Sequence, residues 1–202
     1  SFVVKAYEEF TLQSATSIAE RFGRDIGHIS RVSSVAIEIY DKMKKLHGYK
    51  SRERTLLQVS AILQDIGKYV NVKNHALLSY NTITNLDIVG INDHERLIIA
   101  TVCYYHNGNI PSMDSPIYNQ LSQEDRVMVS KLAAILQISN AINTSHSPKF
   151  EQVSVNMKNG KLNIYLTTLK NINLEKWAFI AKSKLFREVY GLNATIIKRG
   201  VL

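Results

Sequence analysis

A single cysteine, Cys103, occurs among the 202 residues, so no disulfide can form within the chain. It lies in the apolar stretch LIIATVCYYH, which indicates a buried core thiol rather than a reactive one. No apolar run reaches the roughly 20 residues that a membrane-spanning helix needs. The opening stretch SFVVKAYEEF is acidic and its apolar part is too short for a signal peptide. These absences predict a cytoplasmic protein with no membrane partner.

Prolines and glycines are also few. Two of the three prolines fall in residues 110–121, which we expect to form a loop. The nine glycines are scattered, and they form none of the Gly-rich loops that cradle phosphates in nucleotide-binding proteins.

Basic residues outnumber acidic residues by 25 to 17, which gives a net charge of +8 and a pI near 9.5. This excess favours polyanionic partners such as polyphosphate, nucleotides or nucleic acid. Nucleic acid is the least expected of the three, because the basic residues are not interleaved with exposed aromatic residues and no nucleic-acid-binding motif occurs.

Apolar residues recur at spacings of three and four through the first 145 residues, which predicts amphipathic helices. Ser51, Ser122 and either Asn92 or Asp93 are suited to be N-caps, while Gly48 and Gly67 are suited to end helices. The predicted helices span residues 14–23, 24–48, 51–67, 75–86, 92–108 and 122–145.

The pattern changes near residue 150. Residues 150–169 alternate apolar and polar side chains on both sides of Asn159-Gly160, which predicts a β-hairpin. An amphipathic helix over 173–191 and a final strand over 193–202 follow. We therefore predict a mainly α protein, with a helical domain over residues 1–148 and a small β-β-α-β lobe over 149–202 packed on it.

Histidines and acidic residues of the helical part occur in an order that is typical of HD-type phosphohydrolases. Such proteins surround a divalent ion with a histidine from one helix, a His-Asp pair that ends another, and an aspartate from a late helix. His28 and Asp65 fit two of these positions. Gln64 stands in place of the paired histidine, and Asn140 and Asn143 stand in place of the late aspartate.

Amide oxygens are weak substitutes for imidazole or carboxylate ligands of a transition metal. We therefore expect an HD-like domain with no metal and no catalytic residue, in which Asp65 is a polar residue at a helix end. The alternative is a metal-dependent phosphohydrolase that acts on nucleotides, in which Asp65 is catalytic. Its metal ligands would be His28, Asp65, His75 and His106.

Two longer stretches carry a specific resemblance. Residues 56–83, LLQVSAILQDIGKYVNVKNHALLSYNTI, are followed at 91–111 by INDHERLIIATVCYYHNGNIP. Their order resembles the C-terminal domain of the exopolyphosphatase/guanosine pentaphosphate phosphatase (Ppx/GppA) family. The matching elements are Gln64 to Gly67, His75 to Ser79, Glu95 to Ala100, and Tyr105-His106 to Pro111. The resemblance covers roughly residues 10 to 198.

Hydrolysis in that family resides in an N-terminal actin-like domain pair, which this chain does not contain. The resemblance thus implies an accessory domain that binds polyphosphate or guanosine polyphosphate and helps to form a homodimer. It implies no cofactor here, and Mg²⁺ in the missing catalytic domain. A further alternative is a non-catalytic oligomerisation module that uses Trp177 and the small lobe.

Basic side chains near Asp65 are the candidates for phosphate binding. Arg24, His28 and Arg31 follow one another at helical spacing, and Arg21 would join them if one helix ran through residues 21–31. Arginine can bind phosphate through two nitrogens at once. The predicted polyphosphate-binding residues are Arg24, His28, Arg31, Lys68 and Lys73, and the predicted pocket residues are Gln64, His75, His106 and Asn140.

Overall fold

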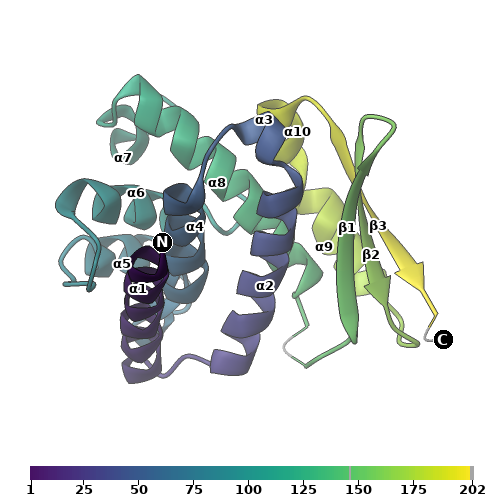
Figure 1. Ribbon diagram of the computed structural model, residues 1–202, viewed down its shortest axis with the longest axis horizontal. Coiled ribbons are helices and arrows are strands. Elements are labelled where there is room, and N and C mark those ends of the chain that lie inside the picture. The colour runs from purple at the N-terminus through teal and green to yellow at the C-terminus, as the bar shows by residue number, and fades with distance from the viewer. Residues whose placement is uncertain (146, 201–202) are drawn as a thin grey trace.

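The computed structural model describes residues 1–145 and 147–200, and within them it is mainly α-helical with a small C-terminal β lobe. Figure 1 shows most of the helices on one side and the sheet on the other, with α2 (Ile26–Lys42) and α8 (Gln123–Ile142) between them. The longer helices are α1 (Phe2–Arg21), α2 (Ile26–Lys42), α4 (Ser51–Leu63), α5 (His75–Ile83), α6 (Asp93–Tyr104) and α8 (Gln123–Ile142). No helix in these residues is both long enough and apolar enough to cross a membrane.

The first two helices are separate, so the condition under which Arg21 would join Arg24, His28 and Arg31 on one helix is not met. The α1 helix ends at Arg21, Gly23 adopts a positive φ of 69°, and Asp25 caps α2 by accepting a hydrogen bond from the His28 N–H. Arg21 therefore belongs to α1, whereas His28 and Arg31 belong to α2.

The α2 helix breaks at Met43, which the prediction of one helix over 24–48 missed. A four-residue helix, α3 (Lys44–His47), follows and ends at Gly48, which has a positive φ of 75° as expected of a helix stop. The His47 ring is buried and donates from Nε2 to the Tyr40 carbonyl at 2.8 Å. The break thus turns the chain so that the Met43 and His47 side chains both enter the core.

Two details of α4 differ from the prediction. Lys50, not Ser51, is the N-cap, and its backbone N–H donates to the Glu53 carboxylate at 2.9 Å. The helix ends at Leu63, before Gly67, and a short 3₁₀ helix, η1 (Ile66–Tyr69), follows. Gly67 is therefore not a helix stop. The Asn92 and Ser122 caps of α6 and α8 are confirmed.

Gly67 is needed because another backbone passes beside it. A Cβ at this position would lie 2.3 Å from the His75 carbonyl oxygen and 2.5 Å from the Ser79 nitrogen. The Gly67 N–H also donates to Ser79 Oγ at 2.9 Å. This contact seats η1 on α5 and fixes Asp65 relative to His75.

Two predicted segments contain helices that the sequence did not reveal. The loop over 110–121 contains α7 (Pro116–Asn119), with Pro116 in its first turn. The helix predicted over 173–191 is broken at Ser183 into α9 (Asn173–Lys182) and α10 (Lys184–Tyr190). The lobe is therefore β-β-α-α-β, with one helix more than predicted.

The sheet consists of β1 (Gln152–Lys158), β2 (Lys161–Thr167) and β3 (Asn193–Arg199) in the order β1-β2-β3. The predicted hairpin is confirmed: β1 and β2 pair antiparallel, and Asn159 and Gly160 have the positive φ values of 53° and 67° that a type I′ turn requires. The β2 and β3 strands pair in parallel, because α9 and α10 form the crossover between them. Residues 201 and 202, included in the predicted strand, lie outside the described residues.

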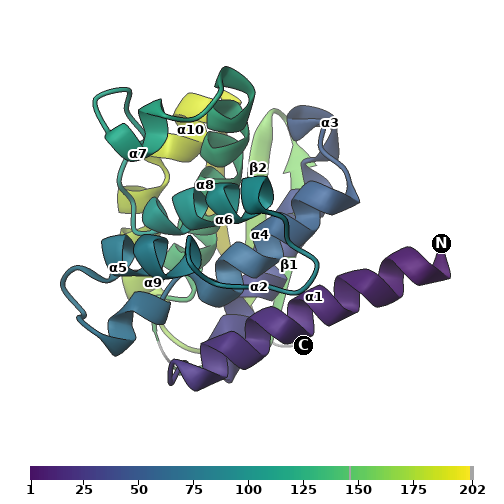
Figure 2. The ribbon, with the colours of Figure 1, turned by 90° about the vertical axis from the view of Figure 1, so that its left-hand side faces the viewer.

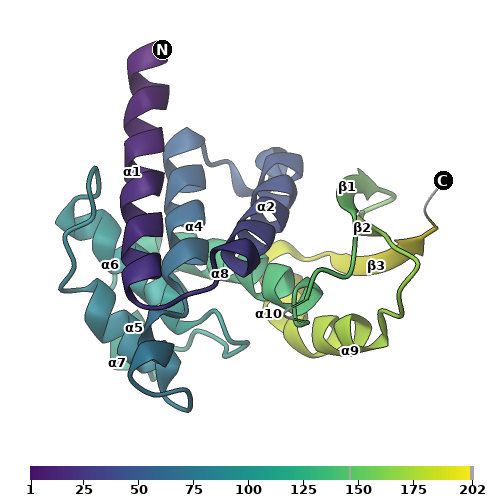
Figure 3. The same ribbon diagram turned by 90° about the horizontal axis from the view of Figure 1, so that it is seen from below.

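The lobe and the helical part share one hydrophobic core. Phe186 of α10 and Leu162, Ile164 and Leu166 of β2 are fully buried in the same cluster as the helical core residues. The α9 and α10 helices pack on α8, and β1 packs on α2. Figures 2 and 3 show that the N-terminal part of α1 projects beyond this body. Cys103 is fully buried, as predicted, and burial raises the pKa of its thiol well above the usual value.

Candidate functional site

A cavity of about 200 Å³ lies where the helical part meets the lobe. Five segments supply its walls: α2, the segment from Asp65 to the start of α5, the residues that follow α6, the end of α8, and the last residue of α9. Polar side chains dominate the wall. They are His28, Asp65, Lys68, His75, His106, Asn107, Asn140, Asn143, Thr144 and Lys182.

Asp65 is the negative centre of this cavity. It is the residue between α4 and η1, and its Oδ1 lies 3.1 Å from Lys68 Nζ, 3.3 Å from His106 Nε2 and 3.5 Å from His75 Nε2. Burial opposes ionisation of this carboxyl, but the hydrogen bond and charge of His106 and the charge of Lys68 outweigh it. The pKa of Asp65 is therefore lowered well below its ordinary value of 3.8, and the side chain is a carboxylate.

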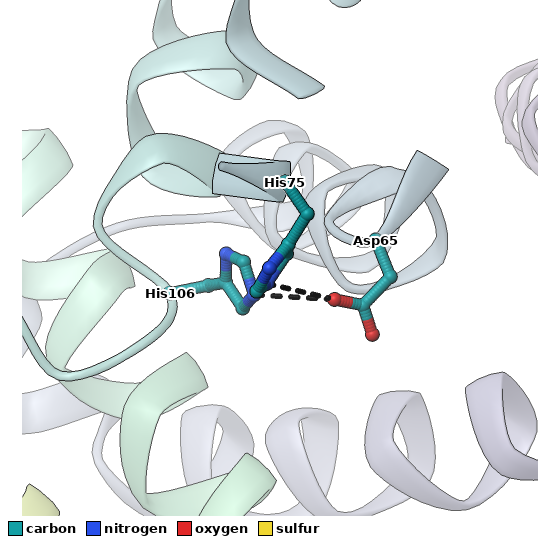
Figure 4. A group of neighbouring side chains, drawn as sticks. All are labelled: Asp65, His75 and His106. Carbon is teal, nitrogen blue, oxygen red and sulfur yellow. Dashed lines mark hydrogen bonds and ion pairs between the residues drawn. The ribbon is translucent and has the colours of Figure 1, made fainter. Parts of the chain in front are cut away.

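The two histidines are held from behind by backbone carbonyls. His75 Nδ1 lies 2.8 Å from the Val72 oxygen, and His106 Nδ1 contacts the Cys103 oxygen. A carbonyl oxygen can only accept, so both Nδ1 atoms carry hydrogen. A ring with no second proton presents a lone pair at Nε2, whereas the charged His106 ring, with a second proton at Nε2, is the form that donates to Asp65 and lowers its pKa. Burial lowers the pKa of His75, which favours the neutral ring there. Figure 4 shows both rings turned toward the Asp65 carboxylate.

Gln64 and Asn140 form a reciprocal amide pair beside the cavity. Gln64 Nε2 donates to Asn140 Oδ1 at 3.0 Å, and Asn140 Nδ2 donates to Gln64 Oε1 at 2.7 Å. Asn140 Nδ2 also contacts the His106 carbonyl at 3.3 Å. The two residues that the sequence identified as departures from an HD-type ligand set therefore satisfy each other, and they link α4 to α8.

This pairing predicts a strong energetic coupling between the two amides. Replacing Gln64 alone with leucine should lower the free energy of unfolding by roughly 1–3 kcal/mol, because the Asn140 amide then loses both hydrogen bonds that it forms with Gln64. Replacing both with leucine should cost less than the two single changes together. Urea unfolding of the two single variants and the double variant measures the coupling, and strict additivity would contradict it.

Lys182 is a cavity residue that the sequence did not reveal. It is the last residue of α9, and its stem packs 3.6 Å from where a Gly108 Cβ would lie. Burial lowers the pKa of its ammonium, while the charge of Asp65 opposes that change. No local pattern marks this lysine, because only the docking of the lobe brings it to Asp65.

The predicted site residues separate into three groups. Asp65, His75, His106, His28, Lys68 and Asn140 line the cavity, and Gln64 lies buried behind it. Arg31 lines a second cavity of about 320 Å³ between α2 and β1. Arg24 lies at the turn between α1 and α2, where its Nε donates to the Phe22 carbonyl, and Lys73 is exposed before α5.

The chemistry available in the cavity is that of a polar, cation-lined pocket around one carboxylate. Two lysines can bind anionic oxygens, and the histidine and carboxylate atoms can bind a cation. Among the described residues, Asp65, His75 and His106 form a group whose ligand atoms lie within 4.8 Å of one another. His28 lines the same cavity from α2.

The fold and this cavity define a mainly helical domain that carries a small β lobe and has a polar cavity where the two parts meet. The family described as Ppx/GppA phosphatase, domain III, matches residues 12–185. The chain therefore belongs to the Ppx/GppA phosphatase family, as its sequence resemblance predicted.

Proposed function

We propose that the chain is an accessory domain of an exopolyphosphatase-type phosphohydrolase and that its cavity binds phosphate groups of polyphosphate or a guanosine polyphosphate. The observation that carries this proposal is the convergence of Lys68 and Lys182, from opposite parts of the fold, on one polar cavity. Their ammonium groups exceed the single negative charge of Asp65. Charge-assisted hydrogen bonds to phosphate oxygens are the strong class of such bonds.

The α2 helix offers a continuation of this site for a longer chain of phosphates. His28 lines the first cavity, and Arg31, three residues later on α2, lines the second, whose wall also includes Ser30, Ser34, Glu38 and Glu151. Side chains three apart on a helix are neighbours, about 5–6 Å from each other at Cβ. A phosphate chain that leaves the first cavity along α2 would therefore reach the Arg31 guanidinium.

Other parts of the proposal rest on the sequence or on the family rather than on the two cavities. Arg24 and Lys73 lie outside both cavities, and their contribution to phosphate binding stays a prediction. The same holds for Mg²⁺ in a separate catalytic domain, for a cytoplasmic location and for a homodimer, which light scattering on the purified chain can test. These features would complete an HD-like domain that serves a hydrolase without performing hydrolysis itself.

Substitution of the two cavity lysines tests the proposal. Lys182→Ala should weaken the binding of polyphosphate of defined length by roughly ten- to a hundredfold, and Lys68→Ala should act similarly, because each removes a charge-assisted bond worth roughly 1.5–3 kcal/mol. Calorimetric titration at several salt concentrations measures both effects, and the loss of a cation should also lower the salt dependence.

Lys176→Ala is the matched control, because Lys176 is an exposed lysine of the same α9 helix outside this cavity. It should leave the affinity within about twofold of the original. Equal losses in all three variants would indicate binding to net positive charge only. Unchanged affinity in both cavity variants would contradict the site.

An exposed apolar surface on the lobe supports oligomerisation as a second function. Trp177 is 78% exposed and Ile180 is 71% exposed on α9, and Leu174, three residues before Trp177 on the same helix, is also exposed. Apolar side chains gathered in this way mark contact surfaces more often than isolated ones do. Trp177→Ser should reduce self-association in light scattering if the predicted dimer uses this face.

A further inference from the structure

The arrangement of Asp65, His75 and His106 contains an electrostatic conflict. Their three facing atoms are one carboxylate oxygen and two imidazole Nε2 atoms, and the Nε2 atoms lie only 3.1 Å apart. Both Nδ1 atoms already carry the hydrogen that they donate to carbonyls. A proton on one Nε2 removes the repulsion between two of these atoms, because one of them then donates to the other. A divalent cation would attract all three.

The separations also fit a coordination sphere. They are 3.1 Å between the two nitrogens, and 3.3 and 3.5 Å from the nitrogens to Asp65 Oδ1. A point equidistant from the three atoms lies about 1.9 Å from each, and an ion slightly above their plane would reach the roughly 2.0–2.2 Å typical of zinc bonds to nitrogen and oxygen.

The surroundings support a metal site in two further ways. Histidine ligands usually donate their second ring nitrogen to a backbone carbonyl or carboxylate, which fixes the ring and its tautomer, and both rings here do so. The remaining directions open into the cavity, where exogenous ligands can complete the coordination.

We propose that Asp65, His75 and His106 hold one divalent transition-metal ion, with open coordination positions facing the cavity. Two imidazole ligands favour ions such as Zn²⁺ or Co²⁺ over Mg²⁺ and Ca²⁺, which prefer oxygen. This site does not require Gln64 or Asn140, because those amides satisfy each other. It therefore differs from the expectation that their loss as ligands abolishes metal binding.

Lys68 provides an internal test because it competes for the same oxygen. Its Nζ lies 3.1 Å from Asp65 Oδ1, the atom that would bind the metal. The ammonium must move away when the ion binds, and its charge repels the ion. Lys68→Met should therefore tighten metal binding by roughly three- to tenfold. The loss of Lys68 has the opposite expected effect on phosphate, whose binding it should weaken, so the two proposals can be tested separately.

Cobalt titration of the chelator-treated protein tests the site. The wild-type chain should bind one equivalent of Co²⁺, with the visible absorption bands of nitrogen and oxygen ligation, and Zn²⁺ should displace it. His75→Asn and His106→Asn should each weaken binding by more than the ~10–100-fold expected from the loss of an outer-sphere partner. His94→Ala is the matched control, because His94 forms an exposed pair with Asp125 on α8 at 2.9 Å.

Thermal unfolding with and without Zn²⁺ provides a second readout if a variant folds poorly. Zn²⁺ should raise the Tm of the wild-type and His94→Ala proteins, because a ligand that binds only the folded state stabilises it. The rise should be absent in His75→Asn, whose side chain is partly exposed and easier to replace than His106. Failure to bind one equivalent, or binding that survives both histidine changes, would overturn the site.

Discussion

Gly67→Ala should destabilise the protein by more than about 3 kcal/mol, the upper end of ordinary overpacking costs. The new Cβ would meet two backbone atoms, the His75 oxygen at 2.3 Å and the Ser79 nitrogen at 2.5 Å, and backbone cannot rotate aside as a side chain can. Separation of η1 from α5 would also stretch the hydrogen bond from the Gly67 N–H to Ser79 Oγ. In a chain of this size the Tm should fall by roughly 6–12 °C.

Calorimetry or thermal unfolding by circular dichroism measures this effect. Gly200→Ala is a suitable control, because a Cβ there meets nothing within 4 Å. Ser79→Ala separates the two contributions, since it removes the hydrogen-bond acceptor without adding a clash, and it should cost about 1–3 kcal/mol. A Gly67→Ala protein as stable as the wild type would show that η1 and α5 are not in close contact.

Glu175→Gln should lower the free energy of unfolding by about 1–3 kcal/mol at neutral pH. Glu175 of α9 is fully buried, and its carboxylate lies 3.1 Å from Lys149 Nζ and accepts a hydrogen bond from Ser145 Oγ at 2.7 Å. Glutamine keeps a group that can accept from Ser145 but loses the charge that pairs with Lys149. Because Lys149 is partly exposed, water can replace part of what it loses.

The effect should depend on pH in a defined direction. Burial opposes ionisation of Glu175, but the hydrogen bonds from Ser145 and Lys149 and the charge of Lys149 lower its pKa below the ordinary 4.5. A carboxyl with a lowered folded-state pKa contributes stability above its unfolded-state pKa and loses that contribution as the pH falls through the folded value. The difference between the two proteins should be constant above about pH 5 and shrink below pH 4.5.

Chemical unfolding from pH 7 to pH 3 measures this difference. Glu188→Gln is the control, because Glu188 pairs with Lys184 at 3.8 Å on the exposed surface of α10. It should change stability by less than about 1 kcal/mol, as exposed ion pairs usually do. A gap between Glu175→Gln and the wild type that widens toward acid would contradict the assigned direction of the pKa.

Local signals predicted most of the fold. The hairpin at Asn159-Gly160 and the Ser122 cap were predictable because the residues that determine them are adjacent in sequence. The breaks at Met43 and Ser183 were not, because neither has a glycine or proline to mark it. Met43 is buried, so the break there depends on the core that receives its side chain.

In the site, too, local sequence predicted some of the residues, whereas others depend on how distant segments pack. Asp65, His75 and His106 were candidates from their order along the chain, and the structure brings them into one cavity. Arg31 was expected near the same cleft as Lys68, but it lines a different cavity, between α2 and β1. Lys182 was not predicted, because the feature that makes it a site residue is the packing of the lobe on α8 rather than any pattern around it.

Gly67 was correctly singled out in the sequence as a structurally required glycine, but it was assigned the wrong role, that of a helix stop. A glycine after a helical stripe usually indicates a helix stop, yet α4 ends four residues earlier at Leu63. The constraint on Gly67 comes from α5, whose backbone lies against it. Sequence alone cannot separate these two causes, since both require the same small residue at the same place.

The parallel pairing of β2 with β3 has a consequence for the order of folding. The hairpin partner of β2, which is β1, is synthesised just before β2. The other partner, β3, is synthesised only after α9 and α10. Until then one edge of β2 has unpaired backbone groups, next to apolar side chains that the finished lobe buries. Unpaired strand edges favour association between chains. The crossover helices therefore determine how long a newly made chain is exposed to aggregation.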